Sequence, residues 1–173
     1  MKNCRSCKSS KLVNLFSLGN MSFTGKFPKS KETNIKKTKL SLVICSKCSL
    51  VQLDRNYNLK YLYNPDYGYR TGINKTMTQH MISIKKVLSH KSNLSSGDLV
   101  LDIASNDATL LNCYNKNTIK VGVDPLVNKY LRYYKNVNYK ISDFFPSKKI
   151  FNKKLKDKFK IITALSVFYD AKD

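Results

Sequence analysis

No stretch of the 173-residue sequence stays apolar over the roughly 18 residues that a membrane-spanning helix needs. The start of the chain, Met-Lys-Asn-Cys-Arg-Ser-Cys, also lacks the apolar segment of a secretory signal. The sequence therefore argues against a transmembrane protein and predicts a cytoplasmic one. In a reducing compartment, its five cysteines are expected to be metal ligands or free thiols rather than disulfides.

Acidic residues and arginine are both scarce. The 11 Asp and Glu stand against 32 Lys and Arg, a net charge of +21 that is typical of proteins binding nucleic acid or an anionic membrane. Only four of the basic residues are arginine, the side chain suited to bidentate contacts with bases and phosphates. The lysines are spread along the chain, as an AT-rich coding sequence would spread them. Nucleic acid is therefore a disfavoured partner, and no membrane partner is expected.

Composition divides the chain into three zones and predicts an α/β fold. Residues 1–53 hold four cysteines, short apolar runs and turn residues, which indicates a small β-rich module. Residues 54–95 form a helical connector, in which Ile73, Met77, Met81, Ile84 and Leu88 recur at helical spacing on one face. In residues 96–173, strands alternate with short helical segments, the pattern of a parallel, doubly wound sheet.

Two CxxC pairs carry the clearest chemical signal. Cys4 and Cys7 form one pair, and Cys45 and Cys48 form the other. Each CxxC turn places two thiolates at adjacent corners of a tetrahedral metal, so the two pairs complete a closed Cys₄ site. Zinc is the expected metal, and its role is structural because no position is left for water. Unrelated reduced thiols or a dithiol redox motif are the alternatives. Cys113 lies apart in a predicted helix and is expected to be buried and inert.

An acidic residue ends each of the first three strands predicted in the last zone. Asp102 ends the first strand, Asp124 follows it by 22 residues at the end of the second, and Asp143 ends the third. The offset is close to the roughly 20 residues that separate a phosphate-binding turn from a ribose-binding acid. Asp143 stands before Phe144, so that pair could meet an adenine. Helix caps would explain each acid singly, but not three in order.

These motifs, taken in sequence, resemble a known family. The two CxxC pairs, residues 67–74 (Tyr-Gly-Tyr-Arg-Thr-Gly-Ile-Asn) and residues 101–107 (Leu-Asp-Ile-Ala-Ser-Asn-Asp) follow one another as in the zinc-containing, S-adenosylmethionine-dependent sugar C-methyltransferases of antibiotic and surface-polysaccharide pathways. Residues 143–146 and 168–170 are similar to that family as well. The resemblance implies a zinc module followed by a Rossmann-like, class I methyltransferase sheet.

The resemblance also implies roles for individual residues. Asp102, Ala104, Ser105 and Asn106 would hold the methionine part of S-adenosylmethionine, with Ser166 at the same end. Asp124 would hold the ribose, and Asp143 with Phe144 the adenine. The substrate would be a nucleotide-linked keto sugar, deprotonated beside its ketone before the carbanion attacks the methyl group. Tyr67, Tyr69 and Arg70 are candidate catalytic residues of a sugar-facing lid, or else an aromatic hinge packed between domains.

Two departures from the family pattern bear on activity. Ala104 and Ala108 stand where the family has glycine, and alanine resists the positive φ that such turns require. The four strands also amount to about half of a methyltransferase sheet, so the zone 96–173 is expected to be a truncated Rossmann-like domain. The chain is then expected to be inactive unless a second polypeptide supplies the C-terminal half. A zinc-ribbon module that binds nucleic acid or an acidic protein, and an inactive remnant, are the alternatives.

Overall fold

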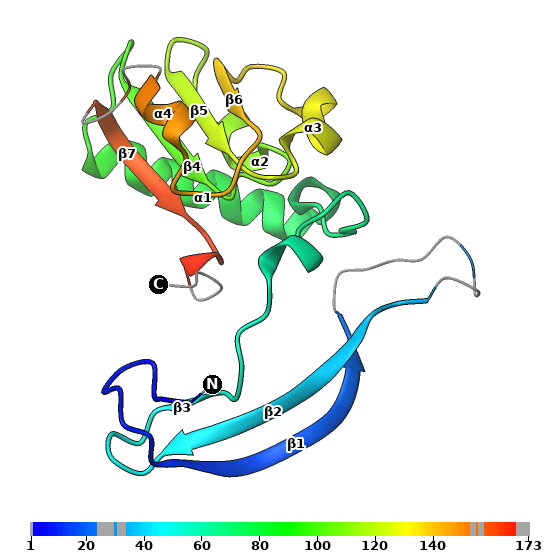
Figure 1. Cartoon of the computed structure of the whole chain (residues 1–173). Helices are drawn as coiled ribbons and strands as arrows, with labels where there is room; N and C mark the ends of the chain where they lie inside the picture. The colour runs from blue at the N-terminus through cyan, green and yellow to red at the C-terminus, as the bar shows by residue number, and fades with distance from the viewer. Residues whose placement is uncertain (1, 24–29, 31–33, 153–154, 156–157, 169–173) are drawn as a thin grey trace. The chain divides into compact units, whose positions relative to one another are not determined.

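The computed structural model describes residues 2–23, 30, 34–152, 155 and 158–168 (Figure 1). It divides the chain into two compact units, one within residues 1–68 and the other within residues 69–171. Tyr169 and Asp170, part of the last family-like motif, lie outside the described residues. The division at Gly68 passes through the segment that the sequence marks as a connector, so its long helix belongs to the second unit.

The first unit contains a three-stranded antiparallel sheet in the order β1-β2-β3. Its strands are β1 (Leu12–Ser22), β2 (Lys37–Cys45) and β3 (Val51–Leu53), and the short 3₁₀ helix η1 (Leu59–Tyr61) follows. Along β2, buried side chains at Ser41, Val43 and Cys45 alternate with half-buried leucine and isoleucine. This period of two is the pattern of a strand with two different faces. The antiparallel sheet confirms the small β-rich module that the sequence predicts near the N-terminus.

The second unit contains a four-stranded parallel sheet in the order β6-β5-β4-β7. The strands are β4 (Leu99–Ile103), β5 (Ile119–Val123), β6 (Tyr139–Ile141) and β7 (Phe159–Ala164). Counted along the chain, the order is third, second, first, fourth, which is how a doubly wound nucleotide-binding sheet begins. The α/β fold predicted from the alternation of strands and helices is therefore confirmed.

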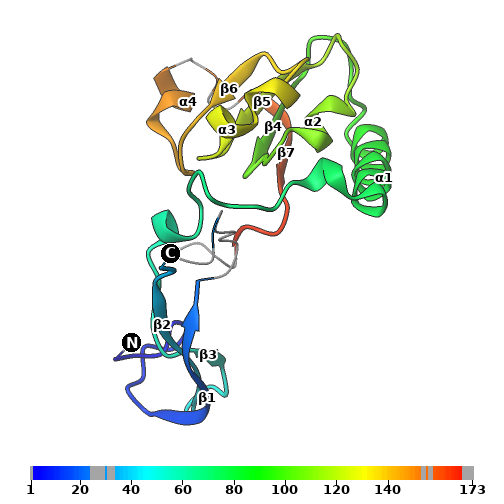
Figure 2. The ribbon, with the colours of Figure 1, turned by 90° about the vertical axis from the view of Figure 1, so that its right-hand side faces the viewer.

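Helices cover both faces of this sheet (Figure 2). Those facing β4 and β5 on one side are α1 (Lys75–Lys91) and α2 (Thr109–Asn112), while α4 (Lys148–Asn152) lies on the other side. The short α3 (Val127–Tyr130) and η3 (Leu131–Tyr133) follow β5, and η2 (Thr71–Ile73) precedes α1. On the α4 side, Ile150 packs with Leu101, Ile103 and Val121 into the principal core cluster. Apolar residues on both faces are what a parallel sheet requires.

The opposite face of the sheet holds a close packing contact at Gly122. A Cβ added to Gly122 would come within 2.9 Å of Ser105 Oγ and of Tyr134 Cε1, and within 3.0 Å of Leu111 Cδ1. The absence of a side chain therefore lets the ring of Tyr134 lie against β5 directly below the loop that follows β4. That ring is fully buried.

Helix α1 reproduces part of the predicted apolar face. Met81 is buried, and Met77, Ile84 and Leu88 are half-buried. Ile73 was expected on the same face, but it ends η2 before the helix begins and is 69% exposed. The helix starts at Lys75 because the Asn74 side chain accepts a hydrogen bond from the Met77 backbone amide, which caps the first turn. Within the described part of the chain, no helix is long and apolar enough to cross a bilayer.

Candidate functional site

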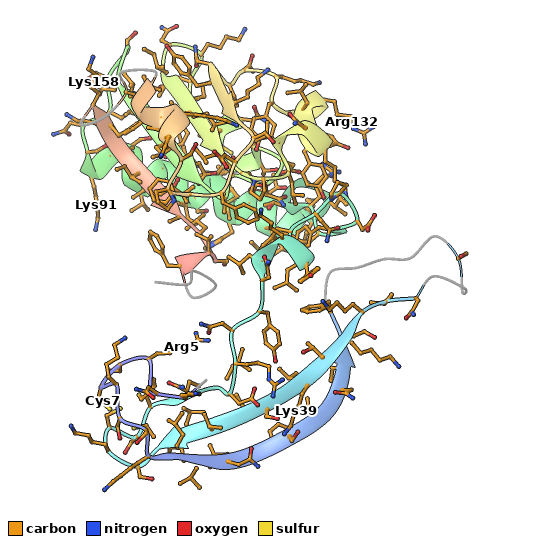
Figure 3. The ribbon with its side chains drawn as sticks, viewed as in Figure 1. Arg5, Cys7, Lys39, Lys91, Arg132 and Lys158 are labelled. Atoms are coloured by element: carbon orange, nitrogen blue, oxygen red, sulfur yellow. The ribbon has the colours of Figure 1, made fainter. Side chains whose placement is uncertain are left out.

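The four cysteines of the two CxxC pairs meet in the first unit. Their sulfurs all lie within 4.8 Å of one another, with Cys4 Sγ 3.6 Å from Cys48 Sγ and Cys7 Sγ 3.6 Å from Cys45 Sγ. Zn–S bonds of about 2.3 Å in a tetrahedron put the sulfurs about 3.8 Å apart, so the spacing fits this metal. Figure 3 shows Cys7 and Arg5 together on the loop that precedes β1. The predicted ligand set is thus brought to one point.

The two turns have the same backbone geometry. Lys8 and Ser49, each directly after the second cysteine of its pair, have φ of 60° and 61°. Each donates its amide to the carbonyl of the first cysteine, at 3.1 Å for Lys8 to Cys4 and 2.8 Å for Ser49 to Cys45. Two equivalent turns that face each other present four sulfurs from opposite sides, which makes a closed tetrahedral site. Such a site is structural because no ligand position is left for water.

Backbone amides prepare these sulfurs for a cation. At Cys45, desolvation raises the thiol pKa, but hydrogen bonds from the amides of Cys48 and Lys47 outweigh it and bring the pKa down to about 6. At Cys48, a hydrogen bond from the Leu50 amide lowers the pKa, but the neighbouring thiols outweigh it and raise the pKa to about 11. Four thiolates crowded together repel one another, and a divalent cation at their centre removes that repulsion.

In the second unit, the residues predicted to bind a cofactor lie at the carboxyl edge of the parallel sheet. Asp102 is the penultimate residue of β4, and the loop after this strand contains Ala104, Ser105 and Asn106. Asp124, Asp143 and Phe144, and Ser166 follow β5, β6 and β7. The carboxyl edge is where doubly wound sheets bind their ligands. Hydrogen bonds join the first two strand ends directly, while Asp143 and Ser166 each stand on their own segment.

Asp102 is a buried carboxyl group. Its Oδ1 accepts a hydrogen bond of 2.7 Å from Thr163 Oγ1 on the neighbouring strand β7. Desolvation raises its pKa to about 7, with the nearby charge of Asp124 adding to the rise and the Thr163 hydroxyl opposing it. Among the described residues, no lysine or arginine forms an ion pair with it. The site therefore lacks the positive charge that would favour the ionised form.

Asp124 ties the end of β5 to the loop after β4. Its Oδ2 accepts the amide of Asn106 at 2.9 Å, and its Oδ1 accepts the amide of Leu126 at 2.7 Å. Burial raises its pKa to about 6 even though both amides lower it. The two amides use one lone pair on each oxygen, and each oxygen keeps a second lone pair for a ligand hydroxyl.

The loop after β4 adopts positive φ at three alternating residues, Ala104 (58°), Asn106 (48°) and Ala108 (61°). Asparagine tolerates this left-handed region, but alanine does not. The backbone strain that the sequence predicted for Ala104 and Ala108 is confirmed. Ala108 is also fully buried, so its methyl group contributes packing that partly offsets the strain.

Replacing Ala104 by glycine is expected to stabilise the second unit. Glycine removes the left-handed penalty of about 1 kcal/mol and adds a smaller entropic cost, so Ala104→Gly should raise the free energy of unfolding by about 0.5 kcal/mol. Ala164→Gly, in strand β7, is the matched control and should lower it by about 0.5–1 kcal/mol. Urea unfolding of both variants measures the two changes. A loss of stability in Ala104→Gly would contradict the strain.

A buried carboxylate that sequence reasoning did not single out anchors the segment before α1. Asp107 Oδ2 accepts from Arg70 Nη1 at 3.0 Å and from the Gly72 amide at 2.9 Å. A Cβ on Gly72 would lie 2.8 Å from that oxygen, so only glycine allows the approach. The Arg70 guanidinium also stacks 4.1 Å from the ring centre of Tyr133. Arg70 is thus held by its ion pair with Asp107, in the loop after β4, and by stacking on Tyr133 in η3.

Two more contacts fasten the same segment to the loop. The Asn106 side chain accepts from the Thr71 amide at 2.9 Å and donates to the Tyr69 carbonyl at 3.3 Å. The Tyr130 hydroxyl donates to that same carbonyl at 2.9 Å. The Tyr69 side chain remains 46% exposed. Tyr67 belongs to the first unit, where its ring packs against that of Tyr63. Within the second unit, the structure therefore places Tyr69 and Arg70 against the loop after β4.

The remaining predicted residues have simple local surroundings. Asp143 accepts from the Phe144 amide at 2.9 Å and from Ser147 Oγ at 2.8 Å, and Lys149 Nζ lies 4.0 Å away. Phe144 is half-buried, and Ser166 is exposed with φ of 54°. The two hydrogen bonds that Asp143 accepts stabilise the turn before α4. Cys113 was expected to be buried, but it is half-buried and donates a hydrogen bond to the Thr109 carbonyl.

Tyr134 is a second residue that sequence reasoning missed. Its hydroxyl donates to the Asn106 carbonyl at 2.8 Å and accepts from Ser105 Oγ at 2.8 Å, which fixes the loop from below. Burial raises the pKa of this phenol well above its ordinary value. The apolar spacing of residues 127–134 indicated a helix but carried no sign of this polar contact. Asp107 belongs to the family-like motif of residues 101–107, but nothing in the sequence indicated that its side chain is buried.

Comparison with known proteins finds a similarity in the first unit. Residues 4–63 match the family model Methyltransf_13, described as "Putative zinc binding domain", and the match includes all four cysteines. The N-terminal unit is therefore similar to a zinc-binding domain of a type associated with methyltransferases. No curated protein matches the chain.

Proposed function

We propose that the chain is the zinc-bearing, cofactor-binding part of an S-adenosylmethionine-dependent methyltransferase that C-methylates nucleotide-linked keto sugars. The observation that carries the proposal is the pair of buried carboxyl groups, Asp102 and Asp124, at the carboxyl edge of the sheet. Neither has a cationic partner among the described residues. The match of residues 4–63 to a methyltransferase-associated domain supports the same assignment.

The chemistry of these side chains fits the cofactor. When bound, S-adenosylmethionine supplies a methyl group on a cationic sulfur. Asp124 would accept hydrogen bonds from the ribose hydroxyls through the lone pairs that its two backbone amides leave unused. Asp102 would place its negative charge beside the cationic methionine end, where a positive ligand favours the ionised carboxylate. Asp143 and Phe144, at the end of β6, would face the adenine.

Residues 69–72, which are hydrogen-bonded to the loop after β4, would shape the part of the site that binds the sugar. Because Asp107 and Tyr133 hold the Arg70 guanidinium, Arg70 would act as a positioning residue rather than a proton acceptor. The backbone carbonyl of Tyr69 accepts a hydrogen bond from Asn106 in the loop after β4, and the Tyr69 side chain is exposed. Of the residues predicted to form a lid, Tyr69 would therefore be the one able to reach a sugar. In the proposed reaction, a base would take the proton from the carbon beside the ketone, and that carbon would form a bond to the methyl group as the bond between the methyl group and the cationic sulfur breaks, leaving a neutral thioether.

A further strand would complete the sheet at β7. This strand pairs with β4 on one side, and in the part of the chain that the structure describes no strand pairs with its other side. Ile162 in β7 is 59% exposed and Phe168 just beyond it is 65% exposed. Parallel sheets are usually buried on both faces, and an edge strand has unpaired backbone groups that can pair with a further strand. The free edge of β7 is therefore suited to pairing with an additional strand. The rest of a methyltransferase domain, from a second polypeptide, would provide it.

Calorimetric titration of the zinc-loaded chain with S-adenosylmethionine tests the proposal. We expect binding in the micromolar range that Asp124→Ala weakens by about tenfold or more, because hydrogen bonds to a charged acceptor are lost. Asp98→Ala is the matched control: Asp98 precedes β4, where it accepts the Ser95 amide at the opposite edge of the sheet. That variant should bind as the unmodified chain does.

Three other outcomes would contradict the proposal. Binding that Asp124→Ala leaves unchanged would place the cofactor elsewhere. Steeply salt-dependent binding to DNA or RNA without any response to the cofactor would instead identify a zinc-ribbon binding module. A zinc-loaded chain that responds to neither ligand would be an inactive remnant.

A further inference from the structure

One face of the sheet in the first unit is apolar except for Thr38, which pairs with Met21, and it carries no charged side chain of the three strands. We call it the apolar face, and its residues on β1, β2 and β3 are Val13, Leu15, Phe16, Leu18, Met21, Leu40, Leu42, Ile44, Val51 and Leu53. Six of these side chains, those of β1 and Val51, are 44–52% exposed. A contiguous exposed apolar surface of this kind marks an interaction site.

Two β-bulges in β1 create this face. The sequence Val-Asn-Leu-Phe-Ser-Leu-Gly-Asn-Met has a polar residue at every third position, which does not suit a strand of period two. The register shifts between Asn14 and Phe16 and again between Ser17 and Gly19. At each shift two residues of β1 stand opposite one of β2, first Leu42 and then Leu40. The bulges therefore keep the apolar residues of β1 from Val13 to Met21 on one face.

The polar residues gather on the opposite face. Asn14, Ser17 and Asn20 pair in register with Val43, Ser41 and Lys39 of β2. Ser41 Oγ donates to Ser17 Oγ at 2.9 Å across the two strands. The lysines of β2, Lys37 and Lys39, alternate with the apolar residues and so lie on this face as well. The two faces of one small sheet thus differ completely in charge.

We propose that the apolar face is the interface of a homodimer, in which the sheets of two copies pack face to face. The net charge of +21 makes two copies repel each other wherever lysines meet, and the apolar face brings none together. An acidic partner would be attracted to the lysine-bearing surfaces instead. Two apolar sheet faces that pack together lie about 10 Å apart. A twofold axis would bring the same face of each copy together.

The size and the edges of the sheet favour this arrangement. Burying half of six large apolar side chains on each copy removes roughly 1,000 Å² in total, which reaches the lower range of specific interfaces. Strand addition at the β1 edge would need a regular row of backbone groups. The two bulges interrupt that row, as they do in edge strands protected against pairing. The face, rather than the edge, is left for association.

Sedimentation analysis of the full zinc-loaded chain over a range of concentrations tests the proposal. We expect a dimer with a micromolar dissociation constant, which added salt strengthens because screening reduces the repulsion between the two positive chains. The double variant Phe16→Lys/Leu18→Lys should be monomeric at 100-fold higher concentration. The matched control Asn14→Lys/Asn20→Lys adds the same charge to the same strand on the opposite face and should remain a dimer.

Zinc content and far-ultraviolet circular dichroism verify that each variant folds. Should the double variant fail to bind zinc, Met21→Lys near the end of β1 that lies farthest from the cysteines replaces it, with the same expected loss of the dimer. A chain that is monomeric at 100 µM overturns the proposal. A dimer that resists charge on the apolar face, or that dissociates equally with charge on the opposite face, also overturns it.

Discussion

Removing the metal is expected to unfold the N-terminal unit and leave the second unit folded. Among the described residues up to Gly68, the buried apolar residues are Cys4, Phe23, Val43 and Cys45, and two of these four belong to the cysteine cluster. A unit of this size cannot bury enough apolar surface to be stable by itself. Zinc bound to four thiolates contributes on the order of 10 kcal/mol, which exceeds the stability of any such small domain. Its loss therefore unfolds the unit.

Hydrogen exchange resolved by residue measures this effect. After chelation, or in Cys45→Ser, amides of β1, β2 and β3 should lose protection while those of β4 and β5 keep it. Metal analysis of the unmodified chain should find one zinc per chain. Cys113→Ser is the matched control, since Cys113 is a half-buried thiol in the second unit outside the cysteine cluster. Retained protection of β2 in the metal-free chain would show that the unit folds without zinc.

The parts that sequence reasoning predicted depend on short-range spacing. Cys4 and Cys7, or Cys45 and Cys48, stand in one turn whose geometry is nearly fixed by its own residues, so their convergence needed only two equivalent turns to meet. The parallel sheet was predicted from the alternation of apolar strands with short helices, because helical crossovers join strands that run parallel. The positive φ at Ala104 was predicted from the family resemblance, because the family has glycine at that position.

The parts that sequence reasoning missed depend on contacts between distant residues. Arg70 and Asp107 are 37 residues apart, and nothing in either neighbourhood specifies the other. The bulges in β1 could not be placed because the polar residues at every third position fit neither a regular strand nor a helix. Ile73 fitted a helical spacing, but the cap at Asn74 starts the helix at Lys75, two residues after Ile73. Local patterns say which residues are apolar, and packing decides where they go.

Replacing Asp102 by asparagine is expected to stabilise the second unit above neutral pH. The folded carboxyl has a pKa raised to about 7 from the ordinary value of 3.8, mainly through desolvation. The folded state therefore binds the proton more tightly than the unfolded state, so stability falls as the pH rises from about 4 through about 7. At pH 8 the ionised, buried form costs a few kcal/mol, since each pKa unit corresponds to about 1.4 kcal/mol. Asparagine accepts the Thr163 hydroxyl without that charge.

The difference in unfolding free energy between Asp102→Asn and the unmodified chain isolates this group, because the contribution of the zinc site cancels. The difference should be small at pH 5 and should grow by a few kcal/mol in favour of the variant by pH 8. Asp98→Asn, at the opposite edge of the sheet, should show no such trend. The same substitution should weaken binding of a cationic cofactor, because the uncompensated charge is what a cation would pair with. A difference that does not depend on pH would mean that Asp102 has the same pKa in the folded and the unfolded chain, which would contradict the raised pKa of this buried carboxyl.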